Sequence, residues 1–364
     1  MKTNSTPRMI NYILSSFLLA LLIFGCKKPP ICIPIVNDGN TLMNLAWQDI
    51  TCPGSFDAQP IGNEMTMQTG NQFLYPAFNP NNPYEFICYQ IVADSGSQTQ
   101  LKHQLIKFNL NTGTKTIILE NVSIVGKPAW SKSGWIAYKN IENGLIYVFN
   151  EQLGMSLPFS NFPNGGNRDE NLTWMNDSTL LWGGLDINLK PYLKTRTIGE
   201  ETINTLAYGS PAQNGEEFTV STNNILLTRN SDNTFSFVDL TEGINNWQSV
   251  SFSLGGTKYG SVNWNIDNQK FYAPVMGNLE VSGLYEVDFF TKNTSKIYDF
   301  CQKRFIKEAV CSPDGKYLLI QKIERSFIPD PNDSIIGLGG QIIENSSIWL
   351  YDVQTKKEAK IKLE

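Results

Sequence analysis

The sequence predicts an all-β fold, a β-propeller of six four-stranded antiparallel blades. Three observations predict it. Six segments share one layout, and they recur along the chain at steps of 44 to 52 residues. A period of this size, built from short strands and turns, is typical of propellers with one blade per repeat. The composition agrees, because only 17% of the 364 residues are charged while Gly, Pro and aromatic residues are plentiful, as in turn-rich β proteins.

Each repeat has one anchor residue, which we expect to end its first strand. The anchors are Phe78, Trp130, Trp174, Val220, Trp264 and Cys311. A tight turn of Ser, Pro, Asp, Asn or Gly follows, because these residues preset or tolerate turn dihedrals. Three further strands complete the repeat, such as residues 115–119 as the fourth strand of the first repeat. Stacked blades bury the faces that one blade leaves open. We therefore interpret the anchor rings as packing between blades, with a ring of sugar-stacking Trp residues as the alternative.

Two repeats resemble a known family. The turn Ser312-Pro313-Asp314-Gly315 and the segment Pro128-Ala129-Trp130-Ser131 resemble the repeat of the TolB-like propellers. The resemblance covers residues 70–364 and implies a six-bladed propeller, in agreement with the repeat count. In this interpretation Pro313, Asp314 and Gly315 are structural, like the aromatic anchors, and Asp314 satisfies backbone donors of its turn.

The first residues have the pattern of a secretory signal. Residues 1–12 contain Lys2 and Arg8 but no acid, and residues 13–24 are apolar except for two serines. A helix of this run rises about 18 Å, which is too short for a hydrocarbon core of roughly 30 Å. The segment Leu22-Ile23-Phe24-Gly25-Cys26 resembles the bacterial lipobox, which implies cleavage before Cys26 and lipid on its sulfur and new amino terminus. An ordinary signal anchor with a chance cysteine is the alternative.

These patterns divide the chain into three parts. We expect a lipoprotein signal peptide at 1–25, the lipidated Cys26 with a tether and N-terminal cover at 26–70, and the propeller at 71–364. Several acyl chains would hold the protein stably on a membrane. Lys27 stands where an inner-membrane retention signal would have Asp, so by analogy we expect an outer-membrane lipoprotein of the cell envelope.

The cysteines point to no metal or redox site. Beyond Cys26 five remain, so at least one is unpaired unless a bond links two molecules. Cys32 and Cys52 are the pair we favour, because they are close in sequence and export permits disulfides. Cys88 and Cys311 fall within strand patterns, which favours buried small hydrophobes. No two cysteines have CxxC spacing.

Several function classes have little support in the sequence. The single histidine, His103, excludes a zinc motif with two, and its parity within its strand predicts an exposed strand-edge residue. The net charge of -5 and the absence of a basic run argue against nucleic acid as a partner. No GxSxG, GxGxxG or P-loop motif occurs. We expect no catalytic residue, metal or cofactor, although paired carboxylates for glycoside cleavage stay open.

The long connections offer a candidate binding face. In a propeller the loops between strands two and three, and those between blades, emerge on one face, and the short repeat turns emerge on the other. The connections at 161–171, 208–217 and 321–347 are long, and loops of such length are often functional. We expect a binding site on this face. The alternative is that these loops are solvated and bind nothing. The candidate residues are Arg168, Asp169, Glu170, Arg325 and Phe327.

The expected function is that of a membrane-anchored lipoprotein. Its propeller would act as a non-catalytic protein-interaction module with an envelope protein as partner. The alternative is a glycan-binding or glycan-hydrolysing propeller. Ring closure is also open, since either a strand near residues 64–67 or the last repeat alone could complete the sixth blade.

Overall fold

The computed structural model describes most of the propeller segment and short stretches before it. The described residues are 42, 45–50, 66–68, 71–93, 101–124, 126–161, 168–208, 218–229, 235–250, 254, 258–276, 281–299, 304–329 and 340–363. Cys26, the Cys32–Cys52 pair and Cys301 lie outside them. The residues described here belong to one unit, 42–364. None of them forms a helix able to cross a bilayer.

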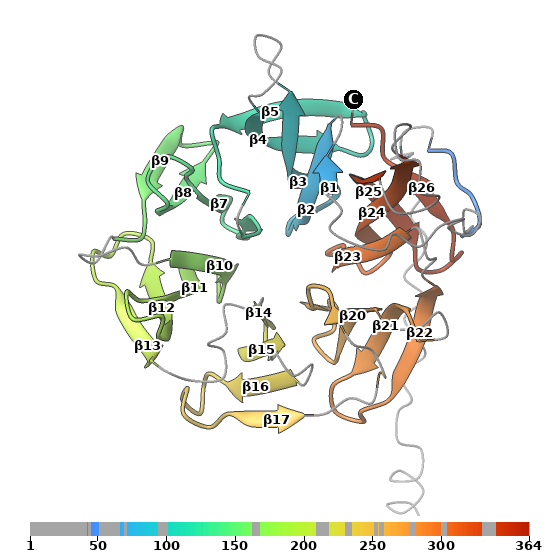
Figure 1. Ribbon diagram of the computed structural model, residues 1–364. Coiled ribbons are helices and arrows are strands. Elements are labelled where there is room, and N and C mark those ends of the chain that lie inside the picture. The colour runs from blue at the N-terminus through green and yellow to red at the C-terminus, as the bar shows by residue number, and fades with distance from the viewer. Residues whose placement is uncertain are drawn as a thin grey trace, which may run out of the picture. The chain divides into compact units, whose positions relative to one another are not determined.

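Six antiparallel sheets stand around a ring (Figure 1). The first three blades contain β2 (Gln72–Asn79), β3 (Asn82–Ala93), β4 (Leu101–Asn109) and β5 (Thr114–Glu120); β6 (Ala129–Trp130), β7 (Trp135–Lys139), β8 (Ile146–Asn150) and β9 (Met155–Pro158); β10 (Arg168–Trp174), β11 (Thr179–Leu185), β12 (Pro191–Thr197) and β13 (Asn204–Tyr208). In each blade the strands pair in chain order, from the inner strand to the outer one.

The other three blades repeat this order. They contain β14 (Phe218–Val220), β15 (Ile225–Arg229), β16 (Phe235–Asp239) and β17 (Gln248–Val250); β18 (Lys258–Tyr259) and β19 (Asn263–Trp264) as a divided inner strand, β20 (Lys270–Met276), β21 (Gly283–Asp288) and β22 (Thr294–Asp299); β23 (Arg304–Cys311), β24 (Tyr317–Pro329), β25 (Gly340–Asp352) and β26 (Glu358–Lys360). The predicted all-β propeller with six four-stranded blades is confirmed.

Each inner strand ends at or one residue beyond its anchor, because the turn residues that follow reverse the chain at once. The turn of the last repeat shows how these residues stabilise the reversal. Gly315 has φ of 74° and donates its N–H to the carbonyl of Ser312, while Asp314 Oδ1 accepts from the Lys316 N–H at 3.2 Å. Ser312 Oγ accepts from the Tyr317 N–H. Glycine tolerates positive φ, and the short polar side chains satisfy the donors that the turn exposes.

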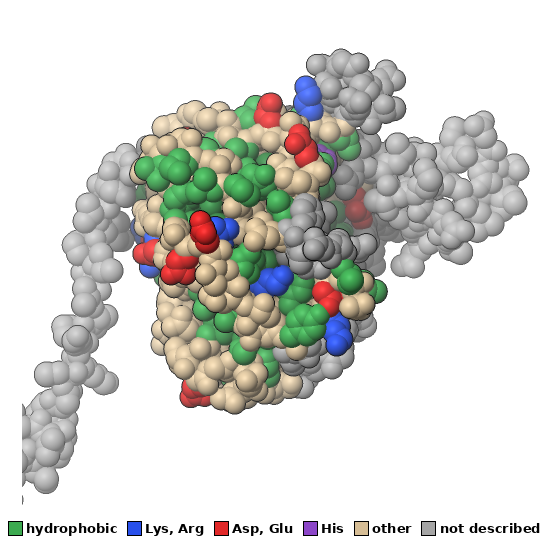
Figure 2. All heavy atoms as spheres, turned by 90° about the vertical axis from the view of Figure 1, so that its left-hand side faces the viewer, with side chains coloured by type: hydrophobic (Ala, Val, Ile, Leu, Met, Phe, Trp, Pro, Cys, Tyr) green, Lys and Arg blue, Asp and Glu red, His purple; other side chains and the backbone are tan. Residues whose placement is uncertain are grey.

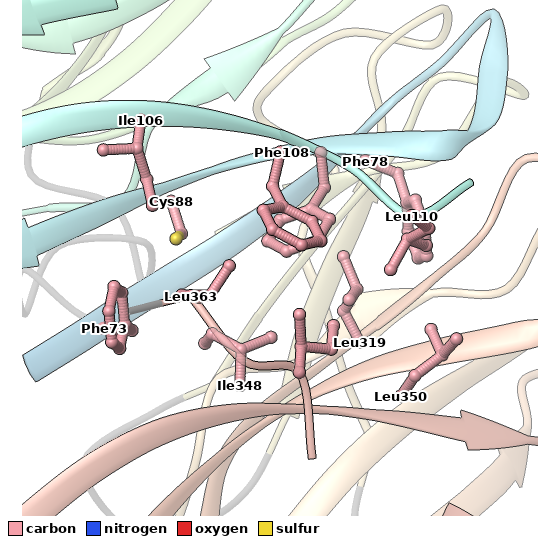
Figure 3. Packing of buried hydrophobic residues seen from close by; sticks show 12 residues of the cluster. Phe73, Phe78, Cys88, Ile106, Phe108, Leu110, Leu319, Ile348, Leu350 and Leu363 are labelled. Carbon is pink, nitrogen blue, oxygen red and sulfur yellow. The ribbon is translucent and has the colours of Figure 1, made fainter. Parts of the chain in front are cut away.

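The hydrophobic cores include residues from neighbouring blades. Figure 3 shows the cluster between blades one and six, where Phe73, Cys88 and Phe108 face Leu319 and Leu350. Cys88 has no exposed surface, so the expectation of a buried small hydrophobe is confirmed for it. Burial raises the pKa of its thiol far above the usual range, which keeps the sulfur protonated.

The sixth blade is completed from both ends of the propeller segment. The last repeat supplies β23 to β26, and β1 (Thr66–Gln68) adds parallel to β25, with Met67 opposite Ile343. Upstream, Gln48 forms an antiparallel bridge with Glu358, and the Trp47 ring stacks on Tyr317 at 6.4 Å. Both modes of closure left open by the sequence therefore contribute.

No strand pairing joins blade six to blade one among the described strands, and side chains hold this seam. The buried Ser346 donates its hydroxyl to the carbonyl of Phe73 at 2.6 Å and accepts from Gln321 Nε2 at 2.9 Å. Its N–H donates to Gln72 Oε1. Gln321 Oε1 in turn accepts from the N–H of Tyr75, which has an unusual φ of 53°. The network binds the inner strand β2 to the hairpin of the last blade.

Replacing Ser346 by Ala should weaken this seam. The change leaves the Phe73 carbonyl without this donor and Gln321 without this acceptor, which should cost about 2 kcal/mol of unfolding free energy. Urea denaturation of the full chain measures it. Thr112→Ala, which removes an exposed hydroxyl pair within one turn, is the control and should cost less than about 0.5 kcal/mol. Equal losses in the two variants would contradict a seam held by side chains.

Two local predictions were wrong. The connection expected at 321–347 is largely a hairpin, because β24 and β25 stay paired without a register shift from Tyr317–Asp352 to Pro329–Gly340. Isoleucines such as Ile323 in β24 and Ile342 and Ile343 in β25 favour extended strands, which sustains the pairing. His103 lies in β4 between two other strands and is half-buried rather than at an exposed sheet edge.

Candidate functional site

A cavity of about 540 Å³ lies on the propeller axis and is lined by the inner strands of all six blades. Every anchor contributes to its wall. At one end the lining includes residues of the repeat turns, such as Pro80, Lys132 and Pro313. At the other it includes Lys127 and Glu308, three positions before their anchors. Apolar walls with a few converging polar groups are typical of binding cavities.

The aromatic anchors have two roles. Phe78 and Trp264 are buried, and the Trp264 ring packs edge-on against Phe271 and Phe289 at 5.9 and 5.3 Å between centroids. Trp174 donates its indole N–H to the carbonyl of Ala129 at 3.0 Å, which ties blade three to blade two. The packing role expected from the sequence is therefore present, and the same rings also form the cavity wall.

An ion pair spans the axis at the end of the cavity opposite the repeat turns, which we call the inner end. Lys127 Nζ of blade two lies 3.1 Å from Glu308 Oε1 of blade six, and the two side chains are 13% and 0% exposed. Asn263 of blade five joins them, because its Oδ1 accepts from Lys127 and its Nδ2 donates to Glu308 Oε1 at 3.2 Å. Paired charges with added hydrogen bonds offset the cost of removing both from water. This axial ion pair has no net charge.

Two polar atoms of the cavity lining are unpaired. Glu308 Oε2 and Trp264 Nε1 are buried, and neither has a hydrogen-bond partner among the described residues. One is an acceptor and the other a donor. Neither atom has exposed surface, so both lie within the wall of the cavity, where a buried polar atom without a partner costs about 1–3 kcal/mol.

The cavity thiol is not poised as a nucleophile. Cys311 donates to Asn265 Oδ1 at 3.4 Å, and burial raises the pKa of its thiol to about 11. Since the thiolate is the reactive form, Cys311 is inert at neutral pH. Glu308 is the single carboxylate among the described lining residues, so this lining lacks the carboxylate pair of a glycosidase. The described residues also contain no group of three metal-ligating side chains of the His, Cys, Asp and Glu types.

The axial ion pair was not predicted from the sequence. Lys127 and Glu308 are 181 residues apart, and each looks like an ordinary surface charge. Aligning the anchors would have shown that both occupy the same place in their repeats. Equivalent positions of a propeller meet around its axis, so opposite charges there were a usable signal.

The predicted binding-face residues lie in strands. Arg168, Asp169 and Glu170 begin β10, where Arg168 pairs with Leu185, and Arg325 and Phe327 lie in β24 opposite Glu344 and Ile342. Their side chains are outside the described part, so their role stays a prediction. The β11–β12 turn, directly after Leu185, belongs to the same face as the start of β10.

Exposed hydrophobic side chains belong to the outer strands and turns of blades two and three, on the side of the molecule that Figure 2 shows. We call them the rim patch: Met155, Leu157, Ile187, Leu189 and Tyr208. Met155 and Leu157 belong to β9, the outer edge strand of its sheet, and are 42% and 39% exposed. Ile187 and Leu189 lie in the β11–β12 turn at 59% and 69%. Exposed apolar residues concentrated in this way mark association surfaces.

The fold is similar to that of solved propellers. No family model and no curated protein matches the chain. A solved structure of a putative TolB from Agrobacterium tumefaciens matches with TM-score 0.53 at 10% identity, covering 70% of this chain and 86% of that protein. TolB from Acinetobacter baumannii matches with TM-score 0.50 at 13% identity, covering 80% of this chain. The chain has the TolB-like propeller fold.

The match is limited to the fold. The aligned region spans 63% of the Acinetobacter protein, so the chain covers less than two thirds of that relative. At 10% to 13% identity the likeness shows the fold alone. The cavity and the rim patch therefore have to be interpreted from their own residues.

Proposed function

We propose that this chain is a non-catalytic protein-interaction module of the bacterial cell envelope and that the rim patch is its docking surface. The observation that carries the proposal is the concentration of exposed apolar residues on β9 of blade two and on the β11–β12 turn of the next blade. An edge strand offers unpaired backbone groups, and apolar side chains beside it lose contact with water when a partner covers them. The partner would be a protein with an apolar surface that packs against this rim.

The site suits docking better than catalysis. Beside the apolar residues, the turn of blade three holds Asp186, which accepts a hydrogen bond from the Tyr208 hydroxyl, and Lys190, whose Nζ lies 5.7 Å from the Tyr208 ring centroid. Polar groups around an apolar centre are the usual anatomy of a protein interface. The hydrogen bond from Tyr208 lowers the pKa of Asp186, which keeps this carboxylate charged at neutral pH.

Anchoring is the second part of the proposal. The lipobox-like segment supports cleavage before Cys26 and lipid attachment there, and the residues from Lys27 to about Asp38 would act as a tether. The lipid would hold the propeller at a membrane of the envelope, which we expect to be the outer membrane. Globomycin treatment, or Cys26→Ala, should leave an unprocessed precursor, detected by its mass. Normal processing of the variant would contradict lipidation.

Charge reversal on the rim patch tests the docking surface. Met155→Glu combined with Leu157→Glu should reduce partner capture from native envelopes more than tenfold, because carboxylates would enter an apolar interface. Ile117→Glu, on the exposed outer strand β5 of blade one, is the matched control and should leave capture unchanged. The measurement is quantitative crosslinked pull-down with the tagged full chain. Equal capture by the double variant and the wild-type chain would contradict the proposal.

A further inference from the structure

We propose that the axial cavity is a binding site for a neutral saccharide, separate from the protein-docking rim patch. The walls give the first reason. Phe78, Trp130, Trp174 and Trp264 come from blades one, two, three and five, so aromatic rings line the cavity from several sides. Sugars present apolar faces of C–H groups between their hydroxyls, and such faces pack well on large flat rings.

The charges of the lining favour a neutral ligand. Lys127 and Glu308 neutralise each other, and the other charged lining residue, Lys132, is exposed among the turn residues. A charged ligand group at the inner end would lose its hydration. It would find no unpaired opposite charge there, which costs several kcal/mol. A hydroxyl carries no such cost. The axial ion pair therefore selects against both acidic and basic ligands.

The remaining polar lining residues are of the kind that hydroxyl groups need. Neutral amides and hydroxyls project from the same inner strands and turns as the aromatic rings. They are Thr173, Thr219, Thr222, Asn263, Asn265, Asn268 and Ser312. Asn263 and Asn268 already hydrogen-bond within the protein, so hydroxyls such as that of Thr173, which both donate and accept, are the better partners for a polyol.

The size of the cavity suits a sugar. The cavity of about 540 Å³ is within the range of roughly 300–1,000 Å³ that is usual for small-ligand sites, which leaves room for a short oligosaccharide.

Ligand-observed NMR on the full chain tests the site. Saturation transfer would be measured for maltotriose, cellotriose, mannotriose and triacetylchitotriose, with trigalacturonate as the acidic probe. We expect transfer to at least one neutral probe and none to trigalacturonate. Trp130→Ala should lower the affinity for the bound probe about tenfold, because it removes one stacking surface. Trp264→Phe keeps a packed ring but offers a smaller stacking surface, so it should also weaken binding in a folded protein.

The rim variants separate this inference from the docking proposal. Met155→Glu with Leu157→Glu should bind the sugar normally, and Trp130→Ala should capture the protein partner normally. The absence of transfer to every neutral probe would overturn the saccharide site, and so would binding that neither Trp variant changes. Loss of protein capture in Trp130→Ala would also overturn it, because the cavity would then belong to the protein interface.

Discussion

Lys322→Met is expected to lower the unfolding free energy by about 3–5 kcal/mol and the Tm by about 10 °C. Lys322 and Glu358 are both fully buried and form an ion pair between β24 and β26. The Lys322 Nζ also lies 3.8 Å from the ring centroid of Trp349. Tyr298 of blade five donates its hydroxyl to Glu358 Oε2 at 2.5 Å, so the cluster joins two blades. Removing the cation leaves a buried carboxylate without its counter-charge.

Two further variants are compared with Lys322→Met. Lys270→Met breaks a pair of 2.7 Å with Glu286 whose side chains are 36% and 21% exposed, so water screens the loss and the cost should stay below about 1 kcal/mol. Adding Glu358→Gln to Lys322→Met removes the stranded charge and should recover part of the stability. Equal losses for Lys322→Met and Lys270→Met, read from guanidinium midpoints, would contradict a structural role for the buried pair.

Gly260→Ala should destabilise the chain by about 3 kcal/mol or more. Gly260 lies between β18 and β19, where blade five meets blade six. A Cβ at this position would lie 2.3 Å from the carbonyl oxygen of Lys307 and 2.9 Å from Pro274 Cβ. The Lys307 carbonyl cannot move away freely, because it accepts a hydrogen bond from the Ser261 N–H at 2.9 Å. The added methyl group must therefore push β23 away from blade five.

The matched control for Gly260 is a glycine with free space around it. Gly199 has φ of 86° and no atom within 4 Å of a Cβ, so Gly199→Ala should cost only the backbone strain of about 1 kcal/mol. Urea denaturation measures both variants. A loss at Gly260 no larger than at Gly199 would show that the two blades can separate without cost, contrary to the packing described here.

The fold was predictable because its determinants are local and repeated. Each anchor, such as Trp130 or Trp264, is followed by turn residues, and both features recur at a blade's spacing. The hairpin of the last blade was not predictable in the same way. Its length suggested a loop, because the sequence does not show that β1 pairs with β25 and extends the sheet of the last blade.

The candidate sites depend on ring closure, which sequence patterns describe poorly. Lys127 and Glu308 meet only because blades two and six face the same axis. Asn263 joins them from a third blade. The rim patch has a different origin, since exposure of Met155 and Leu157 follows from β9 being an outer edge strand. Periodicity predicted strands but not which of them would have a free apolar edge.

Site-specific photocrosslinking in native envelopes tests the proposed function most directly. A photoreactive amino acid placed at Met155 of the full chain should give one dominant crosslinked protein, since this side chain lies within the rim patch. The same amino acid at Ile117, on the outer strand of blade one, should give none above background. Crosslinking that is equal at the two positions, or absent at both, would contradict a protein-interaction module that docks through the rim of blades two and three.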